Sequence, residues 1–162
     1  MSSVNHWPAL GALTPRQAGL VEAAAARIFP TTDTPGATEA SVVTYIDRAL
    51  ADVYPELRSL YVSGTRALAA EAKRRLNVDF LKLTPDQQDA LLTDFEAGNI
   101  ESFPKAAAFF EQLRTHTMEG VLGEPAYGGN RDLVGWKLVG FPGHQFGYQD
   151  AYINTVVDIP PK

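Results

Sequence analysis

The sequence predicts an all-α protein, a compact bundle of about five helices, on three observations. Apolar residues recur at spacings of three and four residues in five separate stretches, which is the spacing that lines one face of an α-helix. Proline or glycine bounds most of these stretches. No strand–helix–strand pattern is present. After the fifth stretch we expect a long, ordered loop rich in glycine and aromatic residues, followed by an extended tail.

The first predicted helix begins at Thr14-Pro15, an N-cap threonine with proline in the first turn, and it stops before Pro30. Turn residues around Pro35-Gly36 lead to the second helix, which starts between residues 38 and 41. Its expected apolar stripe ends at Tyr54-Pro55 and consists of Val42, Val43, Ile46, Leu50 and Val53.

The third helix is predicted over about residues 56–76, with Gly64 on its apolar stripe allowing close approach of a neighbouring helix. Thr84-Pro85 begins the fourth helix with a capping-box pattern, and Gly98 ends it. Phe103-Pro104 precedes the fifth. Its predicted buried face consists of Ala106, Phe109, Phe110, Leu113 and Thr117.

Residues 115–143 hold seven of the thirteen glycines and show little apolar periodicity, so we expect a loop without regular structure. Tyr127, Trp136 and Phe141 are large apolar side chains, and their presence favours an ordered loop in which they are buried. The glycines are expected to permit positive φ or close backbone approach; they are Gly128, Gly129, Gly135, Gly140 and Gly143.

Composition excludes several classes of function. The net charge of −5 argues against nucleic acid or an anionic membrane as the main partner, and the basic run Lys73-Arg74-Arg75 is interpreted as a solvated helix face. The absence of cysteine excludes disulfides, thiolate metal sites and covalently attached haem. No apolar run approaches the length of a membrane span.

Metal and catalytic motifs are weak. His6, His116 and His144 lack the helical spacing of a metal pair, and His116 is placed on the last turn of the fifth helix, where it would favour the helix C-terminus. No HExxH, GxSxG or GxGxxG motif occurs. We therefore expect no catalytic, metal-binding or cofactor-binding residue in this chain.

Two other functions remain open from the residues alone. Glu119, Glu124 and Asp132 could bring two carboxylates together as an acid–base pair in a stand-alone enzyme. Tyr127 and Trp136 could stack on a sugar ring in a small binding module. Against both stands a surface for protein recognition, because aromatic residues dominate buried contact patches.

Three stretches resemble the gluconate 2-dehydrogenase subunit 3 family: RIFPTTDTPGA at 27–37, THTMEG at 115–120 and EPAYGGNRDLVGWKLVGFPG at 124–143. The order and spacing of the YGGN, GWK and GFPG groups carry most of the resemblance, which covers about residues 14–143. The matching positions are expected to form the interface with a partner; they are Pro30, Asp33, Pro35, Gly36, His116, Tyr127, Gly128, Gly129, Asn130, Gly135, Trp136, Phe141 and Gly143.

The resemblance implies a non-catalytic small subunit that stabilises a large, FAD-containing sugar or glycoside dehydrogenase, often with a cytochrome c as electron acceptor. It implies a helical domain over residues 14–143, preceded by an extension over 1–13 and followed by a tail over 144–162. Many such subunits carry a twin-arginine signal, which this sequence lacks. The implied location is periplasmic if a signal was removed and cytoplasmic otherwise.

Overall fold

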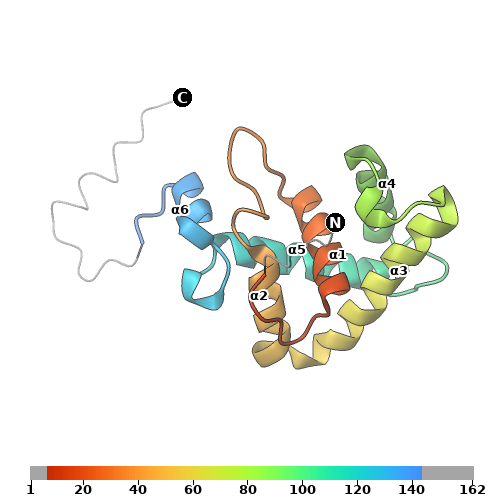
Figure 1. The fold of residues 1–162 in the computed structure, drawn as a ribbon, viewed down its shortest axis with the longest axis horizontal. Helices are drawn as coiled ribbons and strands as arrows, with labels where there is room; N and C mark the ends of the chain where they lie inside the picture. The colour runs from red at the N-terminus through yellow and green to blue at the C-terminus, as the bar shows by residue number, and fades with distance from the viewer. Residues whose placement is uncertain (1–6, 144–162) are drawn as a thin grey trace.

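The structure, a computed structural model, describes residues 7–143, and the all-α prediction is confirmed over this range. The α-helices are α1 (Pro15–Ile28), α2 (Val42–Arg48), α3 (Arg58–Leu76), α4 (Pro85–Glu96), α5 (Ala106–Leu122) and α6 (Val134–Val139). Figure 1 shows α5 crossing the middle of the molecule, with α3 and α4 towards one end and α6 at the other. The predicted tail over 144–162, His6 and His144 lie outside the described residues.

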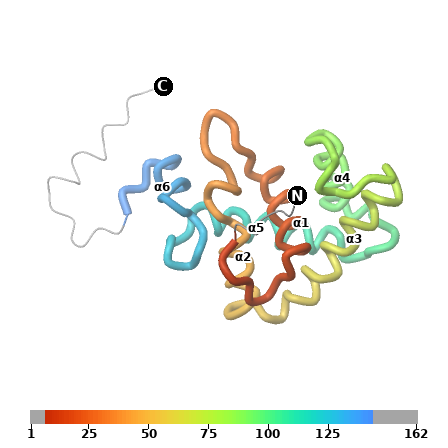
Figure 2. Tube along the Cα trace, in the orientation of Figure 1, coloured from red at the N-terminus to blue at the C-terminus, as the bar shows by residue number. Residues whose placement is uncertain are grey.

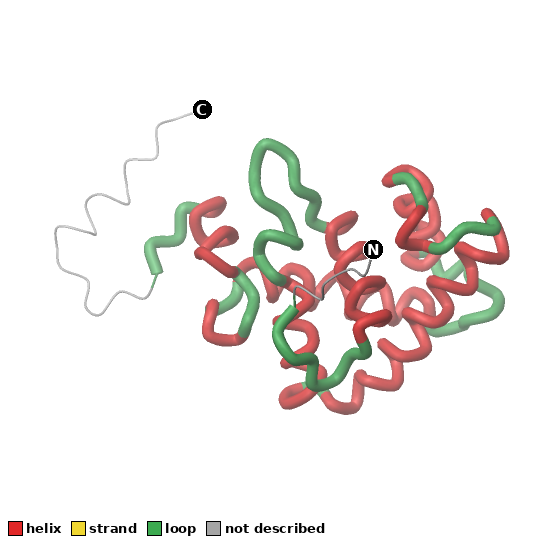
Figure 3. The backbone as a smooth tube through the Cα atoms, in the orientation of Figure 1, coloured by secondary structure: helices red, strands yellow, loops and turns green. Residues whose placement is uncertain are grey.

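Short helical turns lie in several of the connections, whereas the segments between α1 and α2 and between α4 and α5 are loops (Figure 3). They are the π-helix η1 (Ala49–Val53) and the 3₁₀ turns η2 (Pro55–Leu57), η3 (Phe80–Lys82), η4 (Pro125–Tyr127) and η5 (Arg131–Leu133). The longest irregular connection among the described residues lies between α1 and α2 and contains Pro35-Gly36.

Local sequence signals explain the starts of α1 and α4. The hydroxyl oxygens of Thr14 and Thr84 accept from the backbone N–H of Gln17 and Gln87, and both glutamine side chains bond back to the capping residue. Both motifs are capping boxes, which satisfy backbone donors that the first helical turn leaves unpaired; the box was predicted at Thr84, whereas at Thr14 only the N-cap was. Gly98, with φ +73°, follows the end of α4 as expected.

The core forms where α5 contacts all five other α-helices, and Figure 2 shows the path of the chain around it. The predicted inner face of α5 is confirmed, because Ala106, Phe109, Phe110 and Leu113 are all buried. Gly64 of α3 lies so close to Phe109 that an added Cβ would come within 2.3 Å of its ring. The prediction that Gly64 permits close helix approach is therefore confirmed.

The π-helix η1 changes the predicted second helix. A π-turn adds a residue to the turn and shifts the residues after it around the helix axis. Val53, predicted on the buried stripe, is 62% exposed for this reason, whereas Ile46 before η1 and Leu50 in its first half are fully buried. The prediction for Val53 was wrong.

Residues before α1 lie against the helical body. The carboxylate of Asp47 in α2, which is itself buried, accepts from the backbone N–H groups of Gly11, Ala12 and Leu13 at 2.7, 3.0 and 2.8 Å. Three such bonds to one carboxylate satisfy backbone donors that would otherwise be unpaired in the fold. Asp47 thereby positions residues 11–13 on the start of α1.

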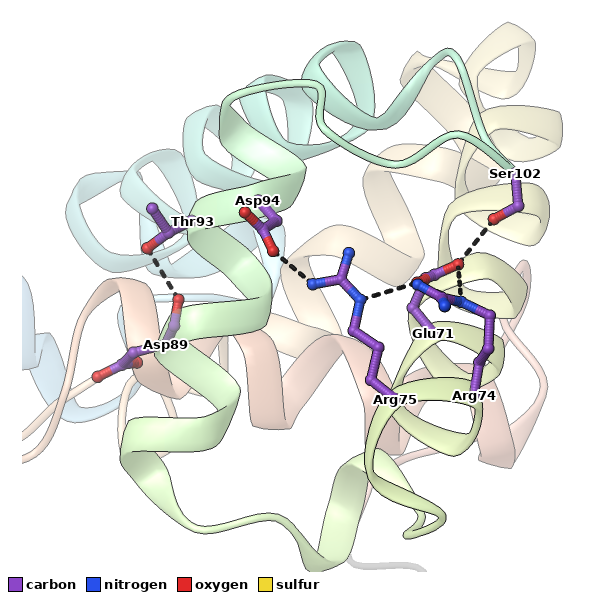
Figure 4. A network of polar contacts seen from close by, with 7 residues as sticks. All are labelled: Glu71, Arg74, Arg75, Asp89, Thr93, Asp94 and Ser102. Carbon is purple, nitrogen blue, oxygen red and sulfur yellow. Dashed lines mark hydrogen bonds and ion pairs between the residues drawn. The ribbon is translucent and has the colours of Figure 1, made fainter.

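The basic run in α3 has a structural role that its composition did not indicate. Arg74 and Arg75 both pair with Glu71, at 2.8 and 3.0 Å, and Ser102 donates to the other carboxylate oxygen at 2.9 Å. Arg75 also pairs with Asp94 of α4 (Figure 4). The Glu71 side chain is only 4% exposed, so these contacts tie α3 to α4 and to the segment before α5.

The network predicts a pH-dependent stability. The hydrogen bond from Arg74 and those from Ser102 and Arg75 lower the pKa of Glu71 to about 2, from 4.5 for the free side chain. A depressed pKa contributes stability that is fully present above pH 4.5 and is lost as the pH falls towards 2. The shift corresponds to about 3 kcal/mol. We expect Glu71→Gln to cost about this much at pH 7, measured by urea denaturation.

The same variant should differ little from the wild type near pH 2, because the wild-type carboxylate is then partly protonated. Glu111→Gln is the control: Glu111 pairs with Arg114 on α5, but both side chains are about half exposed. Exposed pairs contribute roughly 1 kcal/mol or less. A difference between Glu71→Gln and wild type that stays constant from pH 7 to pH 2 would contradict the assignment.

Candidate protein-binding face

The segment after α5 folds back onto the last turn of that helix, at the end of the molecule opposite α4 (Figure 1). Two glycines permit this contact: a Cβ on Gly129 would lie 2.2 Å from the carbonyl oxygen of Gly120, and one on Gly135 would lie 2.0 Å from that of Val121. Gly128, Gly140 and Gly143 instead have φ of +101°, +69° and +90°. The predicted roles of these five glycines are confirmed.

Asn130 holds the segment together. It is fully buried with φ +45°, and its backbone N–H donates to the carbonyl of Gly120 at 2.6 Å. Its side-chain amide donates to the carbonyl of Gly123 and accepts from the N–H of Gly135, both at 2.9 Å. One side chain thus joins the end of α5 to the start of α6, and asparagine tolerates the left-handed backbone better than most residues.

The prediction that residues 115–143 lack regular structure was wrong for much of the range. Residues 115–122 are the last two turns of α5, and α6 with two 3₁₀ turns lies beyond. The buried positions of α5 continue as His116, Thr117, Gly120 and Val121 at helical spacing. Thr117 was predicted on this face, but sequence reasoning missed the continuation to Val121, because His116 is polar and Gly120 has no side chain.

His116 lies inside the bundle, in mid-helix, so its predicted place on the last turn of the helix was wrong. Its Nδ1 lies 2.9 Å from the Tyr61 hydroxyl, and its ring stacks between Tyr54 at 5.3 Å and Tyr61 at 5.8 Å. Burial lowers the pKa of His116, which favours the neutral imidazole. His116 is only 2% exposed, so its imidazole packs beneath the surface residues and is not itself a surface group.

Two of the three aromatic residues expected to be buried are exposed. Tyr127 is 64% and Phe141 46% exposed, so that prediction was wrong for both. Trp136 is partly buried: its Nε1 donates to the carbonyl of Leu122 at 2.8 Å, and its ring meets Phe141 edge-on at 4.7 Å. Trp136 therefore fixes the local fold and also orients an exposed neighbour.

Exposed apolar side chains gather on this segment. Half of the large apolar side chains that are exposed among residues 7–143 lie between positions 122 and 141, namely Leu122, Tyr127, Leu133, Leu138, Val139 and Phe141. We call this set the terminal apolar face. It includes an open hollow of about 550 Å³ lined by Leu122, Glu124, Tyr127, Trp136, Val139 and Phe141. Apolar groups gathered in this way are typical of a surface that binds another molecule.

The first motif lies on the connection between α1 and α2, where Pro30, Asp33 and Pro35 are exposed and Gly36 is buried. Glu39, in the same connection, accepts from the Thr31 hydroxyl and from the N–H of Gly36, which lowers its pKa. The connection is joined to the terminal segment at Arg131, whose backbone N–H donates to the carbonyl of Ala40 at 3.1 Å and whose Nε donates to that of Glu39 at 3.3 Å. Two stretches distant in sequence are joined there.

The three candidate carboxylates lie in different surroundings. Glu119, on α5, accepts from the Tyr45 hydroxyl at 2.7 Å. Burial raises the pKa of Tyr45, and the bond to Glu119 raises it further. Glu124 lines the hollow of the terminal apolar face, and Asp132 is exposed on η5 with φ +57°. This arrangement gives no support to an acid–base pair.

No group of three or more potential metal ligands lies together within residues 7–143. Over the same range, none of the helices is sufficiently long and apolar to cross a membrane. The structure thus describes an all-helical protein whose most distinctive surface is apolar and is built on the end of its central helix.

Comparison with known proteins identifies the family of this all-helical chain. The model of the gluconate 2-dehydrogenase subunit 3 family matches residues 15–143, and the chain belongs to that family. No curated protein and no solved structure matches the chain. The family's description makes the chain a subunit of a dehydrogenase complex. The suspected interface residues, the FAD of a partner, the cytochrome acceptor and the cellular location stay predictions.

Proposed function

We propose that this chain is the non-catalytic small subunit of an FAD-dependent sugar dehydrogenase, and that the terminal apolar face binds the large subunit. The observation that carries the proposal is the gathering of exposed apolar side chains on a segment whose backbone is held rigidly by Asn130 and by close glycine contacts. A rigid surface loses little conformational entropy on binding, so more of the contact energy is retained as affinity.

Binding stabilises the large subunit by mass action, because the small subunit binds its folded form and not its unfolded chain. Catalysis and FAD belong to the large subunit in this proposal. An obligate contact of this kind typically buries more than about 2,000 Å² of total surface. The terminal apolar face would supply its centre, and the exposed residues Pro30, Asp33 and Pro35 lie on a neighbouring connection that could extend it.

The direct test is co-expression with the large flavoprotein subunit, followed by size-exclusion chromatography read by protein and by flavin absorbance. The proposal expects the chain to co-elute with a flavin-containing species that reduces an artificial dye in the presence of sugar. A large subunit that is soluble, flavin-loaded and fully active without this chain would refute the accessory role.

Single substitutions on the face sharpen the test. We expect Tyr127→Ala and Phe141→Ala each to weaken the complex tenfold or more, because exposed aromatic residues at the centre of an interface carry much of its binding energy. The melting temperature of the isolated chain should change little, since Tyr127 is 64% exposed and Phe141, whose ring contacts Trp136, is 46% exposed. Trp136→Ala is less informative, because it also removes the bond to Leu122.

Leu76→Ala is the matched control. Leu76 is 41% exposed, but it lies at the far end of α3, near α4 (Figure 1). Affinity would be measured by biolayer interferometry with the captured large subunit. Equal losses for Leu76→Ala and Phe141→Ala would show that the terminal apolar face is not the binding surface.

A further inference from the structure

A second, larger hollow of about 720 Å³ lies on the other side of Tyr127, and the proposed interface does not account for it. We call it the tyrosine cleft. One wall comes from the end of α2 and the π-helix η1, and the other from η4. It is lined by Tyr45, Arg48, Ala49, Asp52, Val53, Tyr54, Ala126 and Tyr127. Its volume is within the range typical of small-molecule sites.

The aromatic wall of the cleft is held in place from behind. Tyr54 stacks on His116 at 5.3 Å with an interplanar angle of 17°, and His116 stacks in turn on the fully buried Tyr61. The hydroxyl of Tyr45 donates to Glu119 at 2.7 Å. These contacts leave the two tyrosine rings little rotational freedom, so a ligand that packs on them would meet a surface already ordered.

The opposite wall is fitted closely to the first. Gly128 follows η4 with φ +101°, and a Cβ at this position would lie 3.0 Å from the Arg48 guanidinium and 3.1 Å from the methyl group of Thr44. Arg48 donates to the carbonyl of Ala126 at 3.3 Å. The cleft is therefore a junction between two rigid walls that are far apart in the sequence.

Several polar groups at the cleft have no hydrogen-bond partner in the described part of the chain. Among residues 7–143, no hydrogen bond or ion pair engages the Asp52 carboxylate or the hydroxyls of Tyr54 and Tyr127, and the Arg48 guanidinium makes a single long bond. The π-helix places Arg48 and Asp52 at the two ends of its wide turn. π-turns inside helices occur frequently at functional sites.

These charges select a class of ligand. Arg48 and Asp52 carry opposite charges, so together they favour neither a cation nor an anion, whereas hydroxyl groups can both donate to a carboxylate and accept from a guanidinium. The tyrosine rings offer apolar faces with polar edges, which suit a ring that is apolar on its flat side and hydroxylated at its rim. We infer that the tyrosine cleft binds a neutral pyranoside.

The inference goes beyond the proposed function and does not depend on it, because this chain alone supplies all the residues involved. The test is a titration of the isotope-labelled full chain with methyl β-D-glucopyranoside, followed by amide chemical shifts. We expect saturable shifts at Asp52, Tyr54 and Tyr127 with a dissociation constant on the order of 1 mM. Gluconate and methylammonium, used as anionic and cationic probes, should bind at least tenfold more weakly.

Two substitutions separate the roles of charge and ring. Asp52→Asn should weaken binding about tenfold, because hydrogen bonds to charged groups are the stronger ones, and it should leave the fold intact since Asp52 is exposed. Tyr54→Ala should weaken it by at least as much. Asp86→Asn, an exposed acid at the start of α4, and Phe141→Ala, in the neighbouring hollow, should bind as the wild type does.

Three outcomes would overturn the inference. The first is the absence of saturable shifts with about 100 mM pyranoside, a hundredfold excess over the expected constant. The second is binding that Asp52→Asn and Asp86→Asn change equally. The third is binding that disappears when the large subunit is present, which would assign the cleft to a protein segment.

Discussion

Gly64→Ala is expected to lower the free energy of unfolding by roughly 2 kcal/mol, although alanine is the better helix former. In the middle of an exposed helix the substitution would stabilise by about 1 kcal/mol. Here the new methyl group would lie 2.3 Å from the ring of Phe109, which is fully buried and edge-on to Tyr61. Overpacking of this kind costs up to about 3 kcal/mol, so it outweighs the gain in helix propensity.

The control is Gly19→Ala in α1, where an added Cβ would make ordinary contacts at 3.6 and 3.7 Å with Leu81 and Trp7. We expect that variant to be stabilised by about 1 kcal/mol. Combining Gly64→Ala with Phe109→Leu should recover part of the loss, because the smaller side chain leaves room for the methyl group. Urea denaturation measures all three. A Gly64→Ala variant as stable as Gly19→Ala would show that α3 and α5 can move apart at no cost.

Asn130→Ala is expected to release the terminal segment from α5 and to abolish complex formation, while the bundle of α1 to α5 stays folded. The substitution leaves the carbonyl of Gly123 and the N–H of Gly135 without their partners, each at a cost of about 1–3 kcal/mol. Alanine also tolerates φ +45° less well, which adds about 1 kcal/mol. The bond from Trp136 to the carbonyl of Leu122 and the packing of Val134 against the core still hold α6, so we expect local opening and not loss of the segment's helix.

Hydrogen exchange of the Gly135 amide measures this opening, and we expect it to accelerate a hundredfold or more. Asn77→Ala is the control, because Asn77 has φ +55° at the end of α3 but within residues 7–143 only its backbone groups, and not its side chain, make hydrogen bonds. Asn77→Ala has the same backbone cost as Asn130→Ala but loses no side-chain hydrogen bond. The exchange rate in Asn130→Asp should be intermediate between those in Asn77→Ala and Asn130→Ala, since the aspartate keeps the acceptor for Gly135 and loses the donor to Gly123. Equal exchange in Asn130→Ala and wild type would assign the rigidity of the segment to the glycine contacts.

Much of the helical body was predictable because its signals are local. Capping boxes at Thr14 and Thr84 and the proline and glycine breaks depend on neighbours within four residues. The spacing of Phe109, Phe110 and Leu113 depends only on helix geometry. The close approach at Gly64 could also be predicted, because a glycine on an apolar stripe has few other uses.

The candidate site was predictable in position but not in form. The glycines and aromatic residues of 115–143 indicated an unusual surface, yet Tyr127 and Phe141 are exposed where burial was expected. Nothing in their own neighbourhood distinguishes an aromatic side chain that fills a core from one that faces solvent. The exposure of Tyr127 and Phe141 depends on how the segment around Gly135 packs against α5, and this contact joins two separate parts of the chain.

Apart from Tyr127, which the sequence offered as a residue that could stack on a sugar ring, the tyrosine cleft had no signal in the sequence. Tyr45 of α2, Tyr54 after η1, Tyr61 of α3 and His116 of α5 are brought together only by packing, in which Tyr54 and Tyr61 stack on His116 and Tyr45 meets it edge-on. The π-turn at η1 depends on the same packing, since it exposes Val53 against the apolar pattern.

Nearest neighbours in the chain therefore settle where the helices begin and end and which of their faces are apolar. Contacts between distant segments settle the length of α5, the burial of His116 and Asn130, and the shape of both hollows. The physical reason is that caps and breaks act within one or two turns, whereas the burial of a polar side chain is favourable only when partners from elsewhere in the chain satisfy its hydrogen bonds.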